Sequence, residues 1–314
     1  MRVLVTGASG FVGAAVKRAF ESGGAEVLGV DVRSAPGVLD VDLADEDQLA
    51  KLFGGDGYDV VAHLAASAVG AAGLLASART DPRRAVDVNV GGTVRLLQAT
   101  REGGTRCFLY ASSTTVYGPA HRYGEQRITE EAALRPMSVY GATKAAAEHL
   151  GTCMVNDTDM TFTALRLPLV YGPNRWYGGA LAPVYELLEA LSAHKEATFA
   201  LDSAETDWVH VDDAAAAFTA LAALERPQDA YHVVGHSGSM LDLCRQIADL
   251  ASDHSIELQA RSVAADSVFP LIDDTRARED FRFSPRYADV RAAAQSLLAG
   301  QGTSETTVQR RPQT

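Results

Sequence analysis

Residues 3–13, Val-Leu-Val-Thr-Gly-Ala-Ser-Gly-Phe-Val-Gly, constrain the fold more than any other stretch of the chain. A short apolar run breaks into Gly7, Gly10 and Gly13, and apolar residues at helical spacing follow, namely Phe11, Val12, Ala15, Val16, Ala19 and Phe20. This pattern predicts a buried strand, a tight turn and the start of a helix. Backbone N–H groups at such a turn can hold a pyrophosphate, because glycines let the backbone approach the anion. A glycine-rich turn that binds nothing is the alternative, since the spacing is G-x-x-G-x-x-G rather than G-x-G-x-x-G.

An acidic residue follows the second predicted strand. Residues 26–30 are mostly apolar and lead into Asp31. A carboxylate about 20 positions past the glycines can accept hydrogen bonds from the ribose diol of NAD and repel the 2′-phosphate of NADP. Arg33 lies two residues further on and could accommodate that phosphate, so NADP stays open as an alternative cofactor. An ordinary turn aspartate is the other interpretation of Asp31.

Composition excludes several classes of partner. The chain has 314 residues, a formal net charge of −12 and a pI near 5.1, so we expect neither nucleic acid nor an anionic membrane to bind it. Cys107, Cys153 and Cys244 lie far apart and form no metal-ligand or disulfide spacing, so we expect no metal site. No apolar run reaches transmembrane length, and a strand predicted from residue 2 leaves no room for a signal peptide. These features predict a cytoplasmic enzyme.

Strand patterns alternate with helical patterns along most of the chain. The predicted strands cover residues 2–6, 26–30, 37–39, 58–63, 105–111, 161–167 and 230–234. The predicted helices cover about 10–22, 45–53, 82–102, 140–156 and 211–225. Several strands are near-continuous apolar runs, as expected when both faces of a parallel sheet are covered. The order predicts an α/β protein with a doubly wound parallel sheet, the Rossmann fold.

The alternation weakens after residue 172, where prolines and glycines become frequent and a helical stretch covers about 180–194. We therefore expect a Rossmann domain at 1–172 whose core also takes about 207–235. A smaller, interleaved C-terminal substrate-binding lobe is expected at about 173–206 and 236–299. The polar tail, 300–314, lacks periodicity and is expected to be disordered.

Residues that can do chemistry gather after the strand predicted at 105–111, at the sheet edge where doubly wound folds bind ligands. They are hydroxyl side chains, namely Ser112, Ser113, Thr114 and Thr115. Tyr140 and Lys144 are four residues apart, so they share one face of a predicted helix. A lysine ammonium beside the phenol would lower the pKa of Tyr140 and let it act as a general acid/base. Surface pairing on a helix produces the same spacing, which becomes specific only in combination with the dinucleotide motif.

With these motifs the sequence resembles the extended short-chain dehydrogenase/reductase family, in its NAD-dependent epimerase/dehydratase group. The resemblance covers nearly the whole chain and rests on residues 6–13, 42–43, 63–66, 89–93, 113, 140, 144, 170–173, 208–213 and 273–287. It implies NAD as the cofactor, bound by Gly7, Ser9, Gly10, Phe11, Val12, Gly13, Asp31, Asp42, Leu43, Leu64, Ala65, Ala66, Asn89, Tyr140 and Lys144. It also implies a homodimer in which the helices at 82–102 and 140–156 pair with their symmetry mates.

The resemblance further implies a catalytic triad. Ser113 would donate a hydrogen bond to the reacting oxygen, with Ser112 and Thr115 as alternatives for that role. Tyr140 would remove the proton, and Lys144 would hold the nicotinamide ribose and tune Tyr140. NAD would supply the redox chemistry and oxidise a hydroxyl to a ketone. A hydride returned to the other face of the ketone would give epimerisation.

Departures from the family pattern bear on the substrate. Dehydratases of the family place Asp-Glu where this chain has Thr114 and Thr115, which argues against dehydration. Nucleotide-sugar members carry an asparagine at the position of Leu169 and, at that of Thr206, an arginine that neutralises pyrophosphate. Arg175 or Arg276 could take the place of that arginine. We expect a small sugar-like substrate, with contacts from Thr114, Thr115, Asn174, Arg175, Trp176, His210 and Arg276.

Three functions follow from the sequence. The motif order favours an NAD-dependent epimerase of a sugar or sugar nucleotide. The missing arginine and asparagine favour an NAD(P)-dependent dehydrogenase or reductase acting on a non-nucleotide sugar, sugar acid or natural-product carbonyl. A non-catalytic NAD-sensing protein is the third, and the presence of both Tyr140 and Lys144 argues against it.

Overall fold

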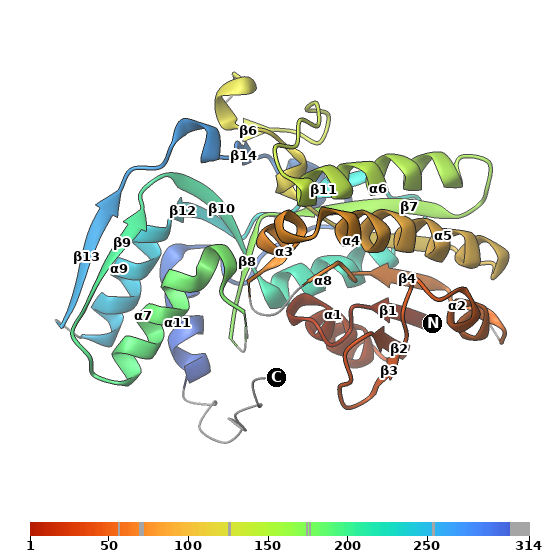
Figure 1. Ribbon diagram of the computed structural model, residues 1–314, viewed down its shortest axis with the longest axis horizontal. Coiled ribbons are helices and arrows are strands. Elements are labelled where there is room, and N and C mark those ends of the chain that lie inside the picture. The colour runs from red at the N-terminus through yellow and green to blue at the C-terminus, as the bar shows by residue number, and fades with distance from the viewer. Residues whose placement is uncertain are drawn as a thin grey trace.

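The computed structural model describes residues 1–55, 57–68, 72–124, 127–173, 175, 177–252 and 255–301. Its centre is a seven-stranded sheet in which every neighbouring pair is parallel (Figure 1). In spatial order the strands are β11 (Ala230–His232), β7 (Thr161–Leu167), β5 (Cys107–Ser113), β4 (Val60–His63), β1 (Arg2–Thr6), β2 (Glu26–Asp31) and β3 (Val38–Asp40). The predicted Rossmann sheet is confirmed, and each predicted strand corresponds to one of these seven.

Helices cover both faces of this sheet (Figure 1). α1 (Phe11–Ser22) and α8 (Val211–Ala222) share a core on one face with Val3 and Val5. On the other face, Leu4 packs in a core with α2 (Glu46–Phe53), α5 (Thr93–Glu102) and α6 (Val139–Val155). Successive β1 side chains point to opposite faces of the sheet, and both faces are buried, which explains the unbroken apolar run in the sequence.

The connections reverse direction at β1. The chain moves from β1 outward to β2 and β3, then crosses back so that β4, β5 and β7 extend the sheet on the other side. Ligands of open parallel sheets bind outside the carboxyl ends of the strands at such a switch point. The fold therefore places its crevice above the ends of β1 and β4.

The helix predicted at 82–102 is more irregular than expected. α4 (Pro82–Val86) is followed by a π-helical turn, Asp87–Gly92, before α5 begins. A further helix that the sequence pattern did not predict, α3 (Leu74–Thr80), packs near α4 and α6. Turns of the π type often occur at functional sites, and this one holds Asn89.

The smaller lobe has its own core, built by α7 (Ala182–Ser192), α9 (Met240–Ala251) and α11 (Val290–Gln301). One small sheet joins β8 (Leu169–Tyr171), β10 (Glu205–His210) and β12 (His236–Ser239), and another pairs β9 (Ala197–Asp202) with β13 (Ile256–Arg261). α11 ends at Gln301, so residues 300 and 301 of the predicted disordered tail are helical. Residues 302–314 lie outside the described part of the chain.

The lobe is interleaved with the Rossmann domain. β14 (Leu271–Ile272) pairs with β6 (Arg127–Ile128), and α10 (Thr275–Asp280) follows it. Ala277 and Phe283 then pack in the core beneath α1 and α8. The chain therefore packs against the Rossmann core again inside the stretch 236–299, where the sequence predicts the lobe.

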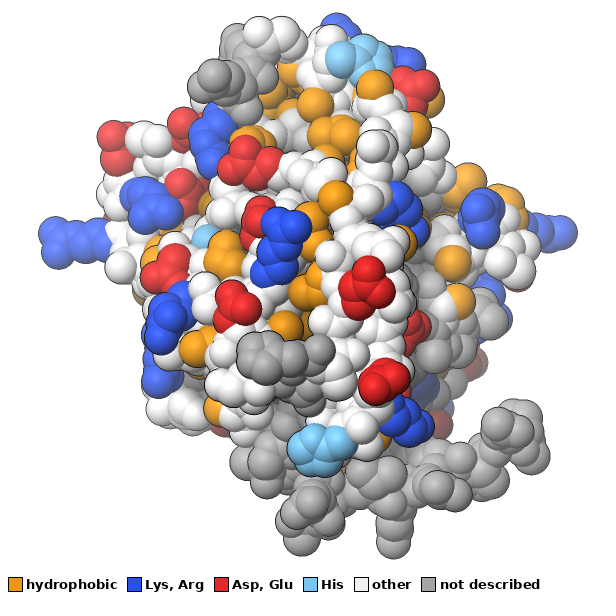
Figure 2. Space-filling model, turned by 90° about the vertical axis from the view of Figure 1, so that its left-hand side faces the viewer, with side chains coloured by type: hydrophobic (Ala, Val, Ile, Leu, Met, Phe, Trp, Pro, Cys, Tyr) orange, Lys and Arg blue, Asp and Glu red, His pale blue; other side chains and the backbone are white. Residues whose placement is uncertain are grey.

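The lobe's outer face carries charges of both signs (Figure 2). On this lobe, Arg261 of β13 pairs with Asp202 of β9 at 2.6 Å. Basic and acidic side chains are intermixed over this face. Among the described residues, no helix is both long and apolar enough to cross a bilayer.

Apolar side chains on α4 and α6 remain exposed, so we expect a two-fold homodimer through the helices at 82–102 and 140–156. Val86 at the end of α4 is 49% exposed and Leu150 of α6 is 37% exposed. Burying such residues against a second copy would remove apolar area from water. Light scattering at micromolar concentration should give twice the mass of 33.3 kDa. A monomer mass would contradict the expectation.

Candidate active site

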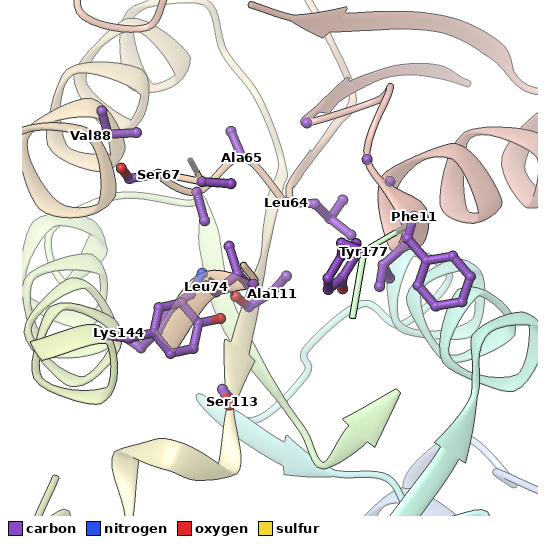
Figure 3. Close-up of a pocket in the computed structure, with 18 of the residues that line it drawn as sticks. Phe11, Leu64, Ala65, Ser67, Leu74, Val88, Ala111, Ser113, Lys144 and Tyr177 are labelled. Atoms are coloured by element: carbon purple, nitrogen blue, oxygen red, sulfur yellow. Dashed lines mark hydrogen bonds between the residues drawn. The ribbon is translucent and has the colours of Figure 1, made fainter. Parts of the chain in front are cut away.

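A cavity of about 1280 Å³ opens above the carboxyl ends of the parallel strands. The glycine turn after β1 and the ends of β2, β4 and β5 line it, together with the start of α6 and the loop after β8. Figure 3 shows Phe11 on one side of this cavity and Ser113 with Lys144 on the other, with Leu64 and Tyr177 between them. The two predicted constellations, the glycine turn and the hydroxyl–lysine group, therefore meet in one place.

Two glycines of the turn are sterically required. A Cβ on Gly13 would lie 2.0 Å from the carbonyl oxygen of Gly7, so helix α1 could not pack against the turn. Gly7 has φ +69°, and a Cβ there would lie 2.7 Å from the backbone nitrogen of Ala65. Gly10, which caps α1, gives no side-chain bond to the helix, and the first turn of α1 holds no acidic residue. The N–H groups at this end of α1 therefore suit an anion such as a pyrophosphate.

Asp31 lies at the end of β2, on the cavity wall. Its carboxylate accepts hydrogen bonds from the backbone N–H groups of Ser9, at 3.1 Å, and Arg33, at 3.0 Å. The Arg33 guanidinium donates to the carbonyl of Ser9 at 3.2 Å. Ser9 does not line the cavity itself but joins the glycine turn to β2. The other predicted cofactor residues on the cavity wall are Gly7, Gly10, Phe11, Val12, Gly13, Asp42, Leu43, Leu64, Ala65 and Ala66.

Lys144 is a buried cation on the cavity wall. Its Nζ donates to the carbonyl of Ala111 at 2.7 Å and lies 4.5 Å from the ring centroid of Tyr110 and 5.7 Å from that of Tyr140. Burial lowers the pKa of Lys144 to about 7, and the nearby Glu148 carboxylate partly opposes that change. Lys144 therefore titrates near neutral pH.

Tyr140 corrects one expectation. We expected Lys144 to lower the pKa of the phenol, but burial raises the pKa of Tyr140 well above its usual value, with Tyr177 adding to the rise. The sequence showed the spacing of the two side chains but not how completely Tyr140 is removed from water. The phenol is neutral in this state, and a positive charge beside it would favour the loss of its proton.

The hydroxyl groups at the end of β5 differ in what they can do. Ser113 Oγ lines the cavity and accepts hydrogen bonds from the backbone N–H and the hydroxyl of Thr115, at 3.2 and 3.1 Å. Those bonds occupy both lone pairs of Ser113 and leave its O–H to donate to a ligand. Ser112 instead donates to the buried Glu148 carboxylate. Ser113 is thus the better placed donor, and Thr114 does not line the cavity.

Sequence reasoning missed a buried ion pair behind these residues. Arg166 of β7 donates to both carboxylate oxygens of Glu148, with distances of 2.8 to 3.2 Å. The same guanidinium donates to Tyr117 Oη at 2.7 Å and to the carbonyl of Glu130 at 2.8 Å. Arg166 lies inside the otherwise apolar run 161–167, and this could have indicated the ion pair, because a buried charge needs a partner of opposite charge.

A chain of buried hydrogen bonds connects β1 with α5. Thr6 Oγ1 and the ring of His63 are 2.6 Å apart, and the other ring nitrogen is 2.9 Å from Thr93 Oγ1. Thr93 donates to the carbonyl of Asn89 at 2.6 Å, inside the π-helical turn. Burial lowers the pKa of His63 to about 3, so the ring is neutral and acts as a structural link.

Asn89 continues this chain to the catalytic helix. Its side chain accepts from the backbone N–H of Ser67 at 2.7 Å and donates to Thr143 Oγ1 at 3.0 Å. Thr143 in turn donates to the carbonyl of Tyr140 at 2.8 Å. Asn89 does not line the cavity, but it fixes the start of α6, which carries Tyr140.

The predicted substrate residues separate into three groups. Arg175 and Thr115 line the cavity. His210 does not, because its buried ring bonds to Ser296 and the backbone of Asp212 and stacks on Tyr287. Arg276 does not either, because it pairs with acidic side chains elsewhere, and Asn174 and Trp176 lie outside the described residues. Within the described part of the chain, no cluster of three or more His, Cys, Asp or Glu side chains could hold a metal ion.

The buried position of Lys144 makes folding stability depend on pH. The unfolded lysine has its ordinary pKa of 10.5, whereas the folded one has a pKa of about 7. Between these values the unfolded state binds more protons, so the free energy of unfolding should rise with pH, by up to about 1.4 kcal/mol per pH unit from this group. Urea unfolding at several pH values from about 7 to 9 should show a smaller slope for Lys144→Met. Lys51→Met, at an exposed lysine, is the control, and equal slopes in all three proteins would contradict the expectation.

Comparison with known proteins agrees with this geometry. A family model described as the NAD dependent epimerase/dehydratase family matches residues 3–234. UDP-glucose 4-epimerase of Streptomyces lividans is 27% identical over 315 residues, which cover 92% of this chain and 93% of that protein.

Two solved structures share the fold. UDP-glucose 4-epimerase of Thermus thermophilus, in complex with NAD, superposes with a TM-score of 0.80 at 24% identity, over 96% of this chain and all (100%) of that one. L-threonine dehydrogenase from Phytophthora infestans gives a TM-score of 0.83 at 22% identity, over 96% of this chain and 99% of that one. The chain is an NAD-dependent enzyme of the extended short-chain dehydrogenase/reductase type and belongs to the NAD-dependent epimerase/dehydratase family.

Proposed function

We propose that this enzyme is an epimerase of a sugar or sugar nucleotide that acts by transient oxidation of a hydroxyl group. The observation that carries the proposal is the convergence of Ser113, Tyr140 and Lys144 in the same cavity as the glycine turn. The named epimerases among the relatives of the chain support the same reaction.

The cofactor residues divide by the part of NAD that each would hold. The turn from Gly7 to Gly13 would bind the pyrophosphate through backbone N–H groups, and Asp31 would accept from the adenosine ribose. Leu64, Ala65 and Ala66, which follow β4, line the cavity on the side of the catalytic residues, and Asp42 and Leu43, which follow β3, line it on the other side of the turn. When bound, NAD would supply the acceptor for the hydrogen on the carbon that bears the reacting hydroxyl, and return it.

Three side chains would take part in removing the proton from the reacting hydroxyl group. Ser113 donates its free O–H to the reacting oxygen, and Tyr140 takes the proton from that oxygen. Lys144 promotes this transfer because its ammonium, close to the Tyr140 ring, stabilises the phenolate. Burial opposes ionisation of the phenol, and the ammonium of Lys144 would favour it.

A dehydrogenase acting on a non-nucleotide substrate is the second candidate. One observation favours it. Among the described residues, none after Ala180 lines the cavity, so the later part of the lobe supplies no side chain that could hold a nucleotide. Thr206, at the position where nucleotide-sugar members carry an arginine, lies in β10 opposite Gly238. An epimerase keeps its NAD and gives no net NADH, whereas a dehydrogenase releases NADH.

Asp31 should make the protein prefer NAD to NADP. The carboxylate would repel the 2′-phosphate of NADP, so NAD should bind at least about tenfold more tightly than NADP. Asp31→Ala should reduce the difference between the two affinities. Titration of both cofactors into the unmodified protein and this variant measures the two affinities. Asp59→Ala, a change outside the cavity wall, is the control. Equal affinities for the two cofactors in the unmodified protein would show that Arg33 dominates.

Tyr140→Phe is the direct test of the proposed mechanism. The variant should lose turnover by roughly 10²–10⁴-fold, the usual contribution of a general acid/base, while its NAD affinity stays nearly unchanged. Tyr58→Phe, whose hydroxyl bonds to Leu52 far from the cavity, is the matched control. Turnover is measured on UDP-sugars and small sugars, with NADH absorbance recorded to separate epimerisation from net oxidation.

Two further variants rank the roles of the triad. Lys144→Ala should reduce both turnover and NAD affinity, because the ammonium also contacts the ribose in the proposed complex. Ser113→Ala should cost less than Tyr140→Phe, about 1.5–3 kcal/mol in the activation free energy. Near-normal turnover of Tyr140→Phe would place the proton transfer elsewhere and refute the mechanism.

A further inference from the structure

Lys144 is a buried cation with which no carboxylate of the described residues forms an ion pair. The residue is 2% exposed. Within the part of the chain that the structure describes, its Nζ has one hydrogen-bond acceptor, the carbonyl of Ala111 at 2.7 Å (Figure 3). Arg166, a second buried cation of this edge, forms an ion pair with Glu148 at 2.8 Å. Because an uncompensated buried charge is unfavourable, the surroundings of Lys144 must stabilise its charge in another way.

Glu148 acts on Lys144 but is already engaged by other groups. Its carboxylate raises the pKa of Lys144, yet burial has the larger effect and the pKa falls to about 7. The same carboxylate accepts hydrogen bonds from the Arg166 guanidinium at 2.8 to 3.2 Å. Arg166 therefore neutralises Glu148, and Lys144 is left as an excess positive charge.

An aromatic face lies beside the ammonium. Lys144 Nζ is 4.5 Å from the ring centroid of Tyr110, on β5, and 5.7 Å from that of Tyr140. The face of an aromatic ring carries partial negative charge and attracts a cation within about 6 Å of its centroid, most strongly where water is excluded. Tyr110 is fully buried, at 0% exposure. Its ring therefore provides part of the stabilisation that Arg166 receives from an ion pair.

Neighbouring rings hold the Tyr110 ring in place. Its centroid lies 5.9 Å from that of Phe162 and 5.7 Å from that of His63. The Tyr110 hydroxyl has no hydrogen-bond partner among the described residues. Burial raises the pKa of Tyr110 well above its usual value, so the phenol stays neutral. The face of the ring, rather than the hydroxyl, is therefore the part of Tyr110 that acts on Lys144.

The other titratable groups near Lys144 do not replace this contact. On the elements around it they are Tyr140 and Glu148 of α6, His63 of β4 and Arg166 of β7. From the start of α4 and from the π-helical turn, the cavity is also lined by Asp81, Arg83, Arg84 and Asp87. Burial keeps Tyr140 and His63 neutral, since it raises the pKa of Tyr140 and lowers that of His63 to about 3. Among the described residues, neither aspartate pairs with Lys144, which leaves the Tyr110 ring and the Ala111 carbonyl to hold the ammonium.

We infer that Tyr110 is a positioning residue of the active site, whose ring face holds Lys144 at the end of β5 as a charged ammonium. Tyr110 does not line the cavity, so it acts through Lys144 and not on a ligand. Because Lys144 titrates near neutral pH, a small change in its surroundings decides whether it is charged there. The use of this charge, to favour the phenolate of Tyr140, rests on the proposed function, whereas the contact between ring and ammonium does not.

The test follows the protonation of Lys144 directly, in the ligand-free protein. The chain has four lysines, so protein made with isotope-labelled lysine gives few side-chain NMR signals, and the Lys144 signal is the one lost in Lys144→Met. Tyr110→Leu should move the midpoint of the Lys144 titration to lower pH by about one pH unit. The reason is that loss of the ring destabilises the ammonium and not the neutral amine.

Two further variants separate the charge distribution of the ring from its packing. Tyr110→Phe keeps the aromatic face and should leave the midpoint nearly unchanged. Trifluorophenylalanine in place of Tyr110 keeps the shape of the ring but withdraws negative charge from its face. Relative to Tyr110→Phe, it should move the midpoint to lower pH, and it tests the inference even where Tyr110→Leu does not fold.

Phe108→Leu is the matched control for loss of a core ring. Phe108 is a fully buried residue of the same strand and stacks on Phe162 at 5.7 Å, but its ring does not lie beside the Lys144 ammonium. This variant should leave the Lys144 midpoint unchanged. A shift as large as that of Tyr110→Leu would overturn the inference, and so would equal midpoints for Tyr110→Phe and the fluorinated variant.

The pH dependence of turnover separates this inference from the proposed function. If Lys144 acts as proposed, the alkaline limb of the turnover profile should move to lower pH in the fluorinated variant, because Lys144 then loses its proton at lower pH. A shifted titration with an unmoved turnover profile would leave the contact standing and refute the proposed role of Lys144. An unshifted titration, in a protein that loses turnover as Tyr140→Phe, would overturn the inference and leave the proposed function standing.

Discussion

A buried ion pair holds the catalytic edge of this protein together. Glu148 and Arg166 join α6 to β7, and the carboxylate also accepts the hydroxyl of Ser112 at the end of β5. Removing one partner of such a pair typically costs roughly 3–5 kcal/mol, because the other charge stays buried and uncompensated. The two elements that present Ser113 and Lys144 are therefore fixed relative to each other by an interaction that itself takes no part in the chemistry.

The cofactor half of the site could be predicted well because it depends on local geometry. Gly7 and Gly13 are required by contacts within one strand–turn–helix unit, so the motif and the structure that it forms are close in sequence. The pairing of Lys144 with Tyr140 could be predicted equally well, because helical spacing alone places the two residues on one face. The strands of the central sheet could also be predicted locally, because burial on both faces leaves a continuous apolar run in the sequence.

What could not be predicted depends on distant partners. The direction in which the pKa of Tyr140 moves follows from how deeply the fold buries the phenol, which no local pattern shows. His210 and Arg276 were candidates for substrate contact in the sequence, but in the fold they bond to Ser296 and Glu131. Arg175 instead bonds to the carbonyl of Val170 and packs over the ring of Tyr177, so the difference between the two arginines appears only when the chain is folded.

The hydrogen bonds that lead from Thr6 to Tyr140 all point the same way, with each donor on the Thr6 side and each acceptor on the Tyr140 side. Because Thr93 donates to the Asn89 carbonyl, it must accept from His63, and His63 must then accept from Thr6. Each proton position is thus dictated by its neighbour, so the ring can adopt one tautomer. Bonds aligned in this way polarise one another, and their dipoles add along the path. The core beneath the cofactor turn and the catalytic helix therefore carries a built-in electric orientation, which Thr93→Val would interrupt by leaving the buried ring N–H of His63 without an acceptor.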